Sequence, residues 1–297
     1  MAVCPATSAR SVAFRLFRRA AIAGGAALAA RVAYRALTSR PPGGAKTWAR
    51  TNHRGEPVTL LEGPAAAVGA GTALALIPGL PGRLRLAGAL CAAGTAGVGA
   101  FDDLAGSGDS RGFRGHLGAL TRGEVTTGMV KIAGIGVVGL ASSALVHREP
   151  VDVLLGGLFV AAGANLVNLF DLRPGRALKV VLAHAPAVLA GTGVAGDLAA
   201  APVGAAAGLV GVDLDEQAML GDAGANALGA LLALAGTAGL SRRTRLVLLL
   251  STAGLTAASE VVSFTGVIQQ TPPLRVLDEL GRRPRDERPP AEPTEAT

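Results

Sequence analysis

Long runs of Ala, Gly, Leu and Val alternate with short polar loops along most of the chain. The apolar runs recur about every twenty residues, which is the length that a helix needs to cross a bilayer. The pattern predicts an all-α fold, a polytopic transmembrane helical bundle with about nine spans. We expect these spans at residues 16–37, 62–80, 84–101, 128–146, 151–170, 180–196, 199–212, 225–240 and 245–258.

Composition also favours a membrane protein. Hydrophobic residues make up 50% of the chain and charged residues only 16%, whereas soluble domains carry charge at about a quarter of their positions. The many Ala and Gly residues predict a tight bundle, because small side chains let helices approach closely in lipid. The net charge of +7 indicates basic loops against an anionic membrane surface, and we expect no nucleic-acid partner.

The two ends of the chain differ from the apolar middle. Arg31 and Arg35 interrupt the first predicted span, so a cleaved signal peptide ending near residues 27–29 is an alternative. Residues 10–19 are expected to lie along the membrane surface as an amphipathic helix. We expect residues 1–283 to form one integral membrane domain, and the Pro- and charge-rich residues 284–297 to form a disordered cytoplasmic tail.

The distribution of Lys and Arg predicts the orientation. Loops around residues 40–54, 111–131 and 173–179 hold more Lys and Arg than the loops at the other ends of the spans. Basic loops usually remain cytoplasmic. The sequence therefore predicts a multi-pass protein of the cell membrane, with these loops in the cytoplasm and the N-terminus outside.

Polar residues gather at the ends of three predicted spans. They are Asp102 and Asp103 after the third span, Asn165, Asn168 and Asp171 at the end of the fifth, and Asp222 at the start of the eighth. Odd-numbered spans run inward and even-numbered spans outward, so all three groups fall on the cytoplasmic side. Carboxylates that converge at one face of a membrane usually have a function.

Each of these groups has an ordinary alternative. The acidic pair could be a solvated loop, the two Asn side chains could join helices by hydrogen bonds, and Asp222 could be a helix N-cap. Taken together, the carboxylates suit Mg²⁺, which binds to one or two carboxylates and to substrate phosphates. The basic loops suit an anionic substrate. The residues therefore predict Mg²⁺-dependent phosphoryl transfer at the cytoplasmic interface.

Five short segments carry a resemblance to a known family. They are RTNHRGEPV, FDDLAG, RGFRGHLGAL with the following TTGMVK, NLVNLFDLRPG, and MLGDAGANALGALL. In this order the chain resembles the polyprenyl-phosphate N-acetylhexosamine-1-phosphate transferases, which include phospho-N-acetylmuramoyl-pentapeptide transferase and the UDP-N-acetylglucosamine:undecaprenyl-phosphate transferases. The resemblance covers the chain from Trp48 to Arg283.

The resemblance implies an enzyme that transfers a sugar-1-phosphate from a UDP-N-acetylhexosamine to a polyprenyl phosphate, releasing UMP, in cell-wall or surface polysaccharide synthesis. It implies catalytic roles for Asp102 and Asp103, with Asp102 as a base for the lipid phosphate, and Mg²⁺ binding by Asp222 and Asp103. A homodimer is compatible with this family. The residues expected to bind substrate are Asn165, Asn168, Asp171, Lys131, His116 and Arg275.

The chain departs from the family pattern in its last segment. Residues 259–283 contain no histidine cluster, and no tenth span follows them. Arg275, Arg282 and Arg283 are the cations available there, and a guanidinium can grip a diphosphate with two hydrogen bonds. This short segment favours a simple UDP-N-acetylhexosamine over a peptide-bearing donor. His53 and His116 are candidate phosphate contacts, and His184 is expected to be a packing residue.

Two other functions remain open from the sequence. The altered final segment is compatible with a scaffold or binding protein that keeps the fold and some of the acidic residues without turnover. A transporter of lipid-linked or phosphorylated solutes would need polar residues at mid-membrane depth. The sequence places nearly all of its polar residues at span ends, which disfavours a transporter.

Overall fold

The computed structural model describes residues 9–105, 126–191 and 193–284, and this part of the chain is almost entirely helical. One antiparallel hairpin interrupts the helices, with Arg50 paired to Val58. The elements are α1 (Ala9–Ser39), α2 (Ala45–Trp48), β1 (Ala49–Thr51), β2 (Pro57–Thr59), α3 (Glu62–Leu76), α4 (Gly82–Ala105), α6 (Thr127–Val146), α7 (Pro150–Phe170), α8 (Arg176–Leu182), α9 (Ala185–Ala190), α10 (Gly193–Leu214), α11 (Gly221–Gly239), α12 (Arg242–Ser259), α13 (Phe264–Gln270) and α14 (Pro272–Glu279).

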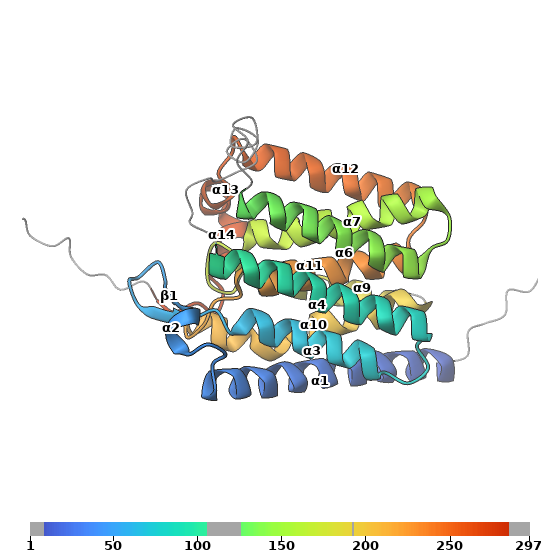
Figure 1. The fold of residues 1–297 in the computed structure, drawn as a ribbon, viewed down its shortest axis with the longest axis horizontal. Helices are drawn as coiled ribbons and strands as arrows, with labels where there is room; N and C mark the ends of the chain where they lie inside the picture. Colours follow the sequence, from blue (N-terminus) through green and yellow to red (C-terminus); the bar gives the residue numbers. More distant parts are fainter. Residues whose placement is uncertain (1–8, 106–125, 192, 285–297) are drawn as a thin grey trace, which may run out of the picture.

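The long helices lie side by side and form a bundle with two ends (Figure 1). One end carries β1, β2, α13 and α14, and we call it the hairpin end; the opposite one is the far end. Helix α11 lies at the centre, where it packs against α4, α7 and α10, and most of its side chains are buried. Helix α12 is peripheral, because only Arg245 and Thr252 in it are buried.

Glycine and alanine allow the helices to pack closely. A Cβ atom at Gly229 on α11 would overlap the carbonyl group of Gly163 on α7, and a Cβ atom at Gly204 on α10 would overlap the carbonyl group of Ala23 on α1. Side chains larger than hydrogen would separate these backbones. The Gly and Ala residues that are frequent in the sequence therefore lie at the contacts between helices.

Several helices are long and apolar enough to cross a membrane. They are α4, α6, α7 and α10, and α12 with α13 would add one more if this pair, bent by 91°, is a single broken span. The predicted class of helical membrane protein is supported at this level, but nine spans are not confirmed. Helix α3, for example, has 15 residues, which is shorter than the ~20 residues of an untilted span.

The continuous helix expected over residues 180–196 is wrong. Helix α8 ends at Leu182, and α9 runs from Ala185 to Ala190 with Pro186 in its first turn. Proline has no N–H to donate, and its ring collides with the preceding turn of a helix. Helix α9 ends at Ala190, and Gly191 follows it with a ψ of 153°, outside the helical range.

The separate surface helix expected over residues 10–19 is also wrong. These residues begin α1, which continues without interruption to Ser39. The guanidinium of Arg19 is buried, and its Nη1 donates to the carbonyl groups of Val188 and Gly191, both at 2.8 Å. Arg19 thereby satisfies carbonyl groups left free at the end of α9, and this attaches α1 to the end of α9.

Candidate functional site

Four helices bring charged side chains together at the hairpin end. Hydrogen bonds join the C-terminal end of α4, the start of α6 and the residue after α7 to the start of α11 or to β1. All of these segments therefore meet next to β1. A Cβ atom at Gly99 on α4 would overlap the Asp222 carbonyl group. The absence of a side chain at Gly99 lets α4 reach the first turn of α11.

Lys131 lies between two carboxylates. Its Nζ is 2.6 Å from Asp102 Oδ2 and 2.6 Å from Asp222 Oδ2. The three side chains come from α4, α6 and α11 and are only 14–20% exposed. One ammonium group therefore neutralises part of the charge of two partly buried acids.

Asp103 points away from Lys131 and binds backbone groups of α11. Its Oδ1 accepts the N–H of Asp222 and its Oδ2 accepts the N–H of Ala223, both at 3.0 Å. The first N–H groups of a helix have no partner within the helix and carry partial positive charge. Asp103 therefore caps α11, and both of its oxygens, which were expected to bind Mg²⁺, are bonded to backbone N–H groups. Asp222, which was a candidate N-cap, presents its own carboxylate to Lys131.

Two further acids, Asp171 and Asp213, lie near Asp103 and Asp222. Asp171 follows α7 and accepts a hydrogen bond from the backbone of Gly221. Asp213 Oδ2 accepts the N–H of Gly175 at 3.0 Å. Burial is the largest influence on Asp171, and the charges of Asp213 and Asp222 add to it, so its pKa lies well above the ordinary 3.8. Asp171 therefore holds a proton at pH values where an exposed aspartate is ionised.

The β1–β2 hairpin is bound to this region by ion pairs and hydrogen bonds. Arg50 Nη2 donates to the carbonyl group of Asp103. The buried carboxylate of Glu216 accepts from Arg54 Nε at 2.9 Å and from Asn52 Nδ2 at 2.8 Å. These contacts place the guanidinium of Arg50 beside the acidic pair.

The structure does not bring every expected substrate residue to Lys131. Asn165 is exposed on α7 and its Nδ2 donates to Thr256 Oγ1 on α12 at 2.9 Å. Asn168 is half-buried near the end of α7, and Arg275 is exposed on α14. His116 lies outside the described residues, as does most of the expected C-terminal tail, residues 285–297.

The three described histidines lie in different surroundings. His53 Nδ1 is 3.7 Å from Glu216 Oε2 at the hairpin end, and partial burial lowers the pKa of His53. His147 Nε2 is 3.0 Å from the Thr237 carbonyl oxygen at the far end. His184, expected to be a packing residue, is instead exposed at the break before α9. Of these, His53 alone lies at the hairpin end.

The donor atoms at Lys131 suit a cation. Among the described residues, no three His, Cys, Asp or Glu side chains are arranged to hold a metal ion. Asp102 Oδ2 and Asp222 Oδ2 nevertheless converge on one positively charged group, and Mg²⁺ is usually held by one or two carboxylates together with substrate phosphates. Two hard oxygen donors at one point therefore fit Mg²⁺, with the other ligands supplied by a phosphorylated substrate.

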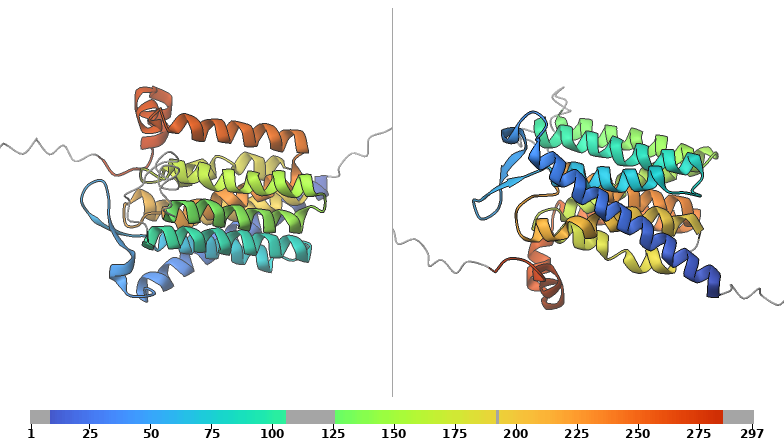
Figure 2. Two further views of the ribbon diagram at one scale, coloured as in Figure 1. Left: turned by 45° about the horizontal axis from the view of Figure 1, so that its top comes forward. Right: turned by 90° about the horizontal axis from the view of Figure 1, so that it is seen from below.

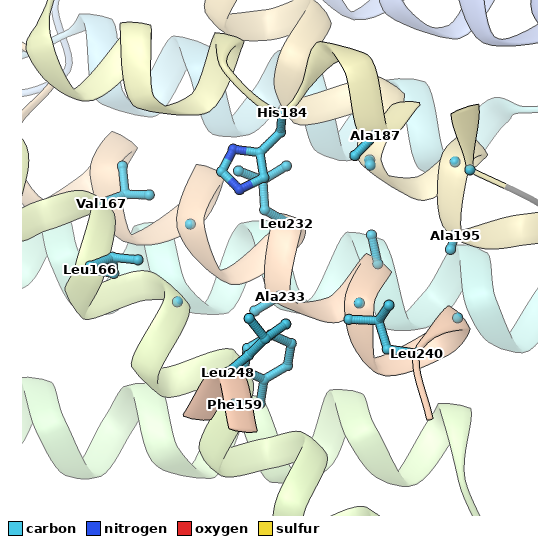
Figure 3. A pocket seen from close by; sticks show the side chains of 18 of the residues that line it. Phe159, Leu166, Val167, His184, Ala187, Ala195, Leu232, Ala233, Leu240 and Leu248 are labelled. Atoms are coloured by element: carbon cyan, nitrogen blue, oxygen red, sulfur yellow. The ribbon is translucent and has the colours of Figure 1, made fainter. Parts of the chain in front are cut away.

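A separate apolar cavity of about 650 Å³ lies between α7, α9, α10, α11 and α12 (Figure 3). Phe159, Leu232 and Leu248 are among its lining residues, and the side chains on its wall are apolar except for His184 and Thr252. Such a wall offers little to a phosphate group, but it can accommodate a hydrocarbon chain. The charged cluster and the apolar cavity therefore suit different parts of an amphipathic ligand.

Sequence reasoning did not single out three of these residues: Arg50, Asp213 and Glu216. Arg50 lies in the RTNHRGEPV segment, and the two acids precede MLGDAG within VDLDEQ. The grouping of acids at span ends that identified Asp222 would also have identified Asp213. By contrast, no sequence signal shows that Glu216 would be buried beneath Arg54.

Comparison with known proteins assigns no family to the chain. No protein-family model matches it, and no curated protein matches its sequence.

Proposed function

We propose that this protein is a membrane enzyme that transfers a sugar-1-phosphate from a UDP-N-acetylhexosamine to a polyprenyl phosphate. The observation that carries the proposal is the convergence of Asp102 and Asp222 on Lys131 at the polar end of an apolar helical bundle. The site combines oxygen donors for Mg²⁺ with fixed cations for phosphates. The five sequence segments that resemble the transferase family contribute most of these residues.

In this proposal the bundle crosses the membrane nine times, and α8 with α9 forms one broken crossing. The contacts at the hairpin end support this topology, because α4 and α7 end where α6 and α11 begin. The hairpin end faces the cytoplasm, where nucleotide sugars are available. The apolar cavity provides room for the hydrocarbon chain of the lipid substrate.

Each residue of the cluster has a role in the proposed reaction. Asp102 and Asp222 would hold Mg²⁺, which would neutralise the diphosphate oxygens. The Asp102 carboxylate oxygen that does not face Lys131 accepts the proton of the lipid phosphate, whose oxygen forms a bond with the sugar-bearing phosphorus of the donor. The anhydride bond to UMP breaks, and Lys131 and Arg50 stabilise the negative charge on the phosphate oxygens. Asp103 positions α11 so that Asp222 remains at the site.

Purified protein should transfer radiolabel from a UDP-N-acetylhexosamine to undecaprenyl phosphate in the presence of Mg²⁺. Asp222→Asn should remove the activity and keep the fold, because it loses a charged oxygen ligand without changing size. Asp215→Asn is the matched control, since Asp215 is exposed at the same end. Wild-type turnover by Asp222→Asn would falsify the metal-binding role. A panel of UDP-sugars identifies the donor, and we expect the muramoyl-pentapeptide donor to be a poor substrate.

A binding protein without turnover is the alternative, and the final segment favours it. Two of the expected donor-binding cations are already paired in the structure. Arg282 Nη2 is 2.7 Å from Asp278 Oδ1, and Arg283 Nη1 is 2.7 Å from Glu56 Oε2. Tight binding of UDP-sugar without release of UMP would support this alternative over the enzyme.

A further inference from the structure

Helix α14 is amphipathic, and its apolar side faces away from the protein. Successive helical residues are turned by about 100°, which places Leu274, Val276 and Leu277 on one side, with Leu280 directly after the helix. These four side chains are 42–65% exposed, whereas Asp278 on the other side is 8% exposed. A helix on the surface of a soluble protein would have the opposite orientation.

The polar side of α14 is attached firmly to the bundle. Arg176 on α8 donates from Nε to Asp278 Oδ1 at 2.7 Å and from Nη2 to Asp278 Oδ2 at 3.0 Å. Lys179 Nζ donates to the Asp278 carbonyl group at 2.7 Å, and Arg282 also binds Asp278 Oδ1. Arg176 Nη1 reaches Thr265 Oγ1 on α13 at 2.9 Å. These bonds fix which side of α14 is outward.

Helix α12, which precedes α13 and α14, also carries exposed apolar side chains. On α12, Leu246, Val247 and Leu250 are 45–62% exposed, and at the bend after it Val261 is 74% exposed. The axis of α13 is turned by 91° from that of α12. If α12 runs across the membrane, α13 lies nearly parallel to the membrane plane. Figure 2 shows α13 and α14 together at the end of α12, outside the long helices.

We propose that α14 rests on the bilayer surface at the hairpin end, with Leu274, Leu277 and Leu280 inserted among the lipids. Interfacial helices bury their apolar side about 5–10 Å into the boundary between headgroups and acyl chains. Arg275 is exposed on the helix, and its guanidinium can bind an anionic headgroup. The inference rests on the membrane topology of the proposed function but not on sugar transfer.

Lipid quenching of a fluorophore tests the proposal in the full-length protein in nanodiscs of phosphatidylcholine and phosphatidylglycerol. In a background lacking Cys4 and Cys91, one variant carries Leu277→Cys and the matched control carries Glu279→Cys on the opposite side of the helix. We expect brominated acyl chains to quench a probe at position 277 and not at 279, and aqueous iodide to give the reverse. Equal iodide quenching at both positions overturns the proposal.

Two further measurements distinguish a lipid contact from a contact with a second copy of the chain. Crosslinking between copies through position 277 would show that a second copy covers the helix, and it would overturn the lipid assignment. Leu277→Glu should leave the helix content unchanged but abolish the lipid quenching of a probe at position 274; persistent quenching there overturns the proposal. Neither readout requires turnover, so an inactive protein that gives the expected quenching would reject the transferase and keep the interfacial helix.

Discussion

Asp103→Asn should destabilise the fold, because Asp103 caps α11 from another helix. The carboxylate accepts two backbone N–H groups at 3.0 Å, one on each oxygen. An amide has one accepting oxygen, and its NH₂ group would face the second N–H donor. The substitution therefore removes one hydrogen bond, leaves a half-buried N–H without a partner and removes the negative charge that Asp103 places at the helix start.

The size of the effect follows from these losses. A hydrogen bond to a charged group contributes about 1.5–3 kcal/mol, and a carboxylate at a partly buried helix N-terminus contributes up to about 2 kcal/mol through the helix dipole. The two contributions overlap, because both arise from the same charge. Relief from burying that charge offsets part of the loss. We therefore expect the free energy of unfolding to fall by about 2 kcal/mol or more.

Reversible unfolding in mixed micelles, followed by circular dichroism, measures the change. Asp222→Asn is the matched control, because it makes the same chemical change at the neighbouring carboxylate on α11 but leaves the cap intact. Lys131 keeps its bond to Asp102 in that variant, so we expect a smaller loss of stability than in Asp103→Asn. If Asp103→Asn is as stable as the wild type, or if Asp222→Asn is the less stable of the two, the capping role assigned to Asp103 is incorrect.

Two further predictions concern topology and pH. A reagent that cannot cross the membrane should label Gln217→Cys from the cytoplasm and Arg148→Cys from outside; labelling of both from one side would exclude a membrane-spanning bundle in this orientation. Burial alone would raise the pKa of Asp278, but Arg176 and Arg282 hold it below the ordinary 3.8. The attachment of α14 is therefore complete above that value and is lost as pH falls through the lowered pKa, so hydrogen exchange in α14 should accelerate only below about pH 4. In Asp278→Asn the exchange should be fast at every pH, and fast exchange in the wild type at neutral pH would contradict the prediction.

Much of the helical architecture could be predicted from the sequence. The apolar runs around residues 84–101, 128–146 and 151–170 each lie within one helix of nearly the expected length. Burial in lipid requires every backbone group to be bonded within the segment, so a long apolar run leaves few alternatives to a helix. The same reasoning failed over 180–196, because average hydropathy does not reveal the local effect of Pro186.

The positions of charged and polar side chains in the fold were harder to predict from the sequence. The arginines near the N-terminus suggested a helix on the membrane surface, but Arg19 binds the carbonyl groups at the end of α9. Those partners lie about 170 residues away in the chain, and no local sequence pattern predicts them. Likewise, Asn165 lies on the apolar helix α7, yet its partner is Thr256 and not the charged cluster.

The sequence by itself determined that acids would collect where the apolar helices end, because charged groups are excluded from the apolar interior of a membrane. It did not determine the separate roles of Asp102 and Asp103. Asp102 and Asp103 are neighbours in sequence, but successive residues of a helix point about 100° apart. Only the packing of α6 and α11 against α4 decides that Asp102 meets Lys131 while Asp103 caps α11. The division of roles between these two residues therefore belongs to the tertiary structure.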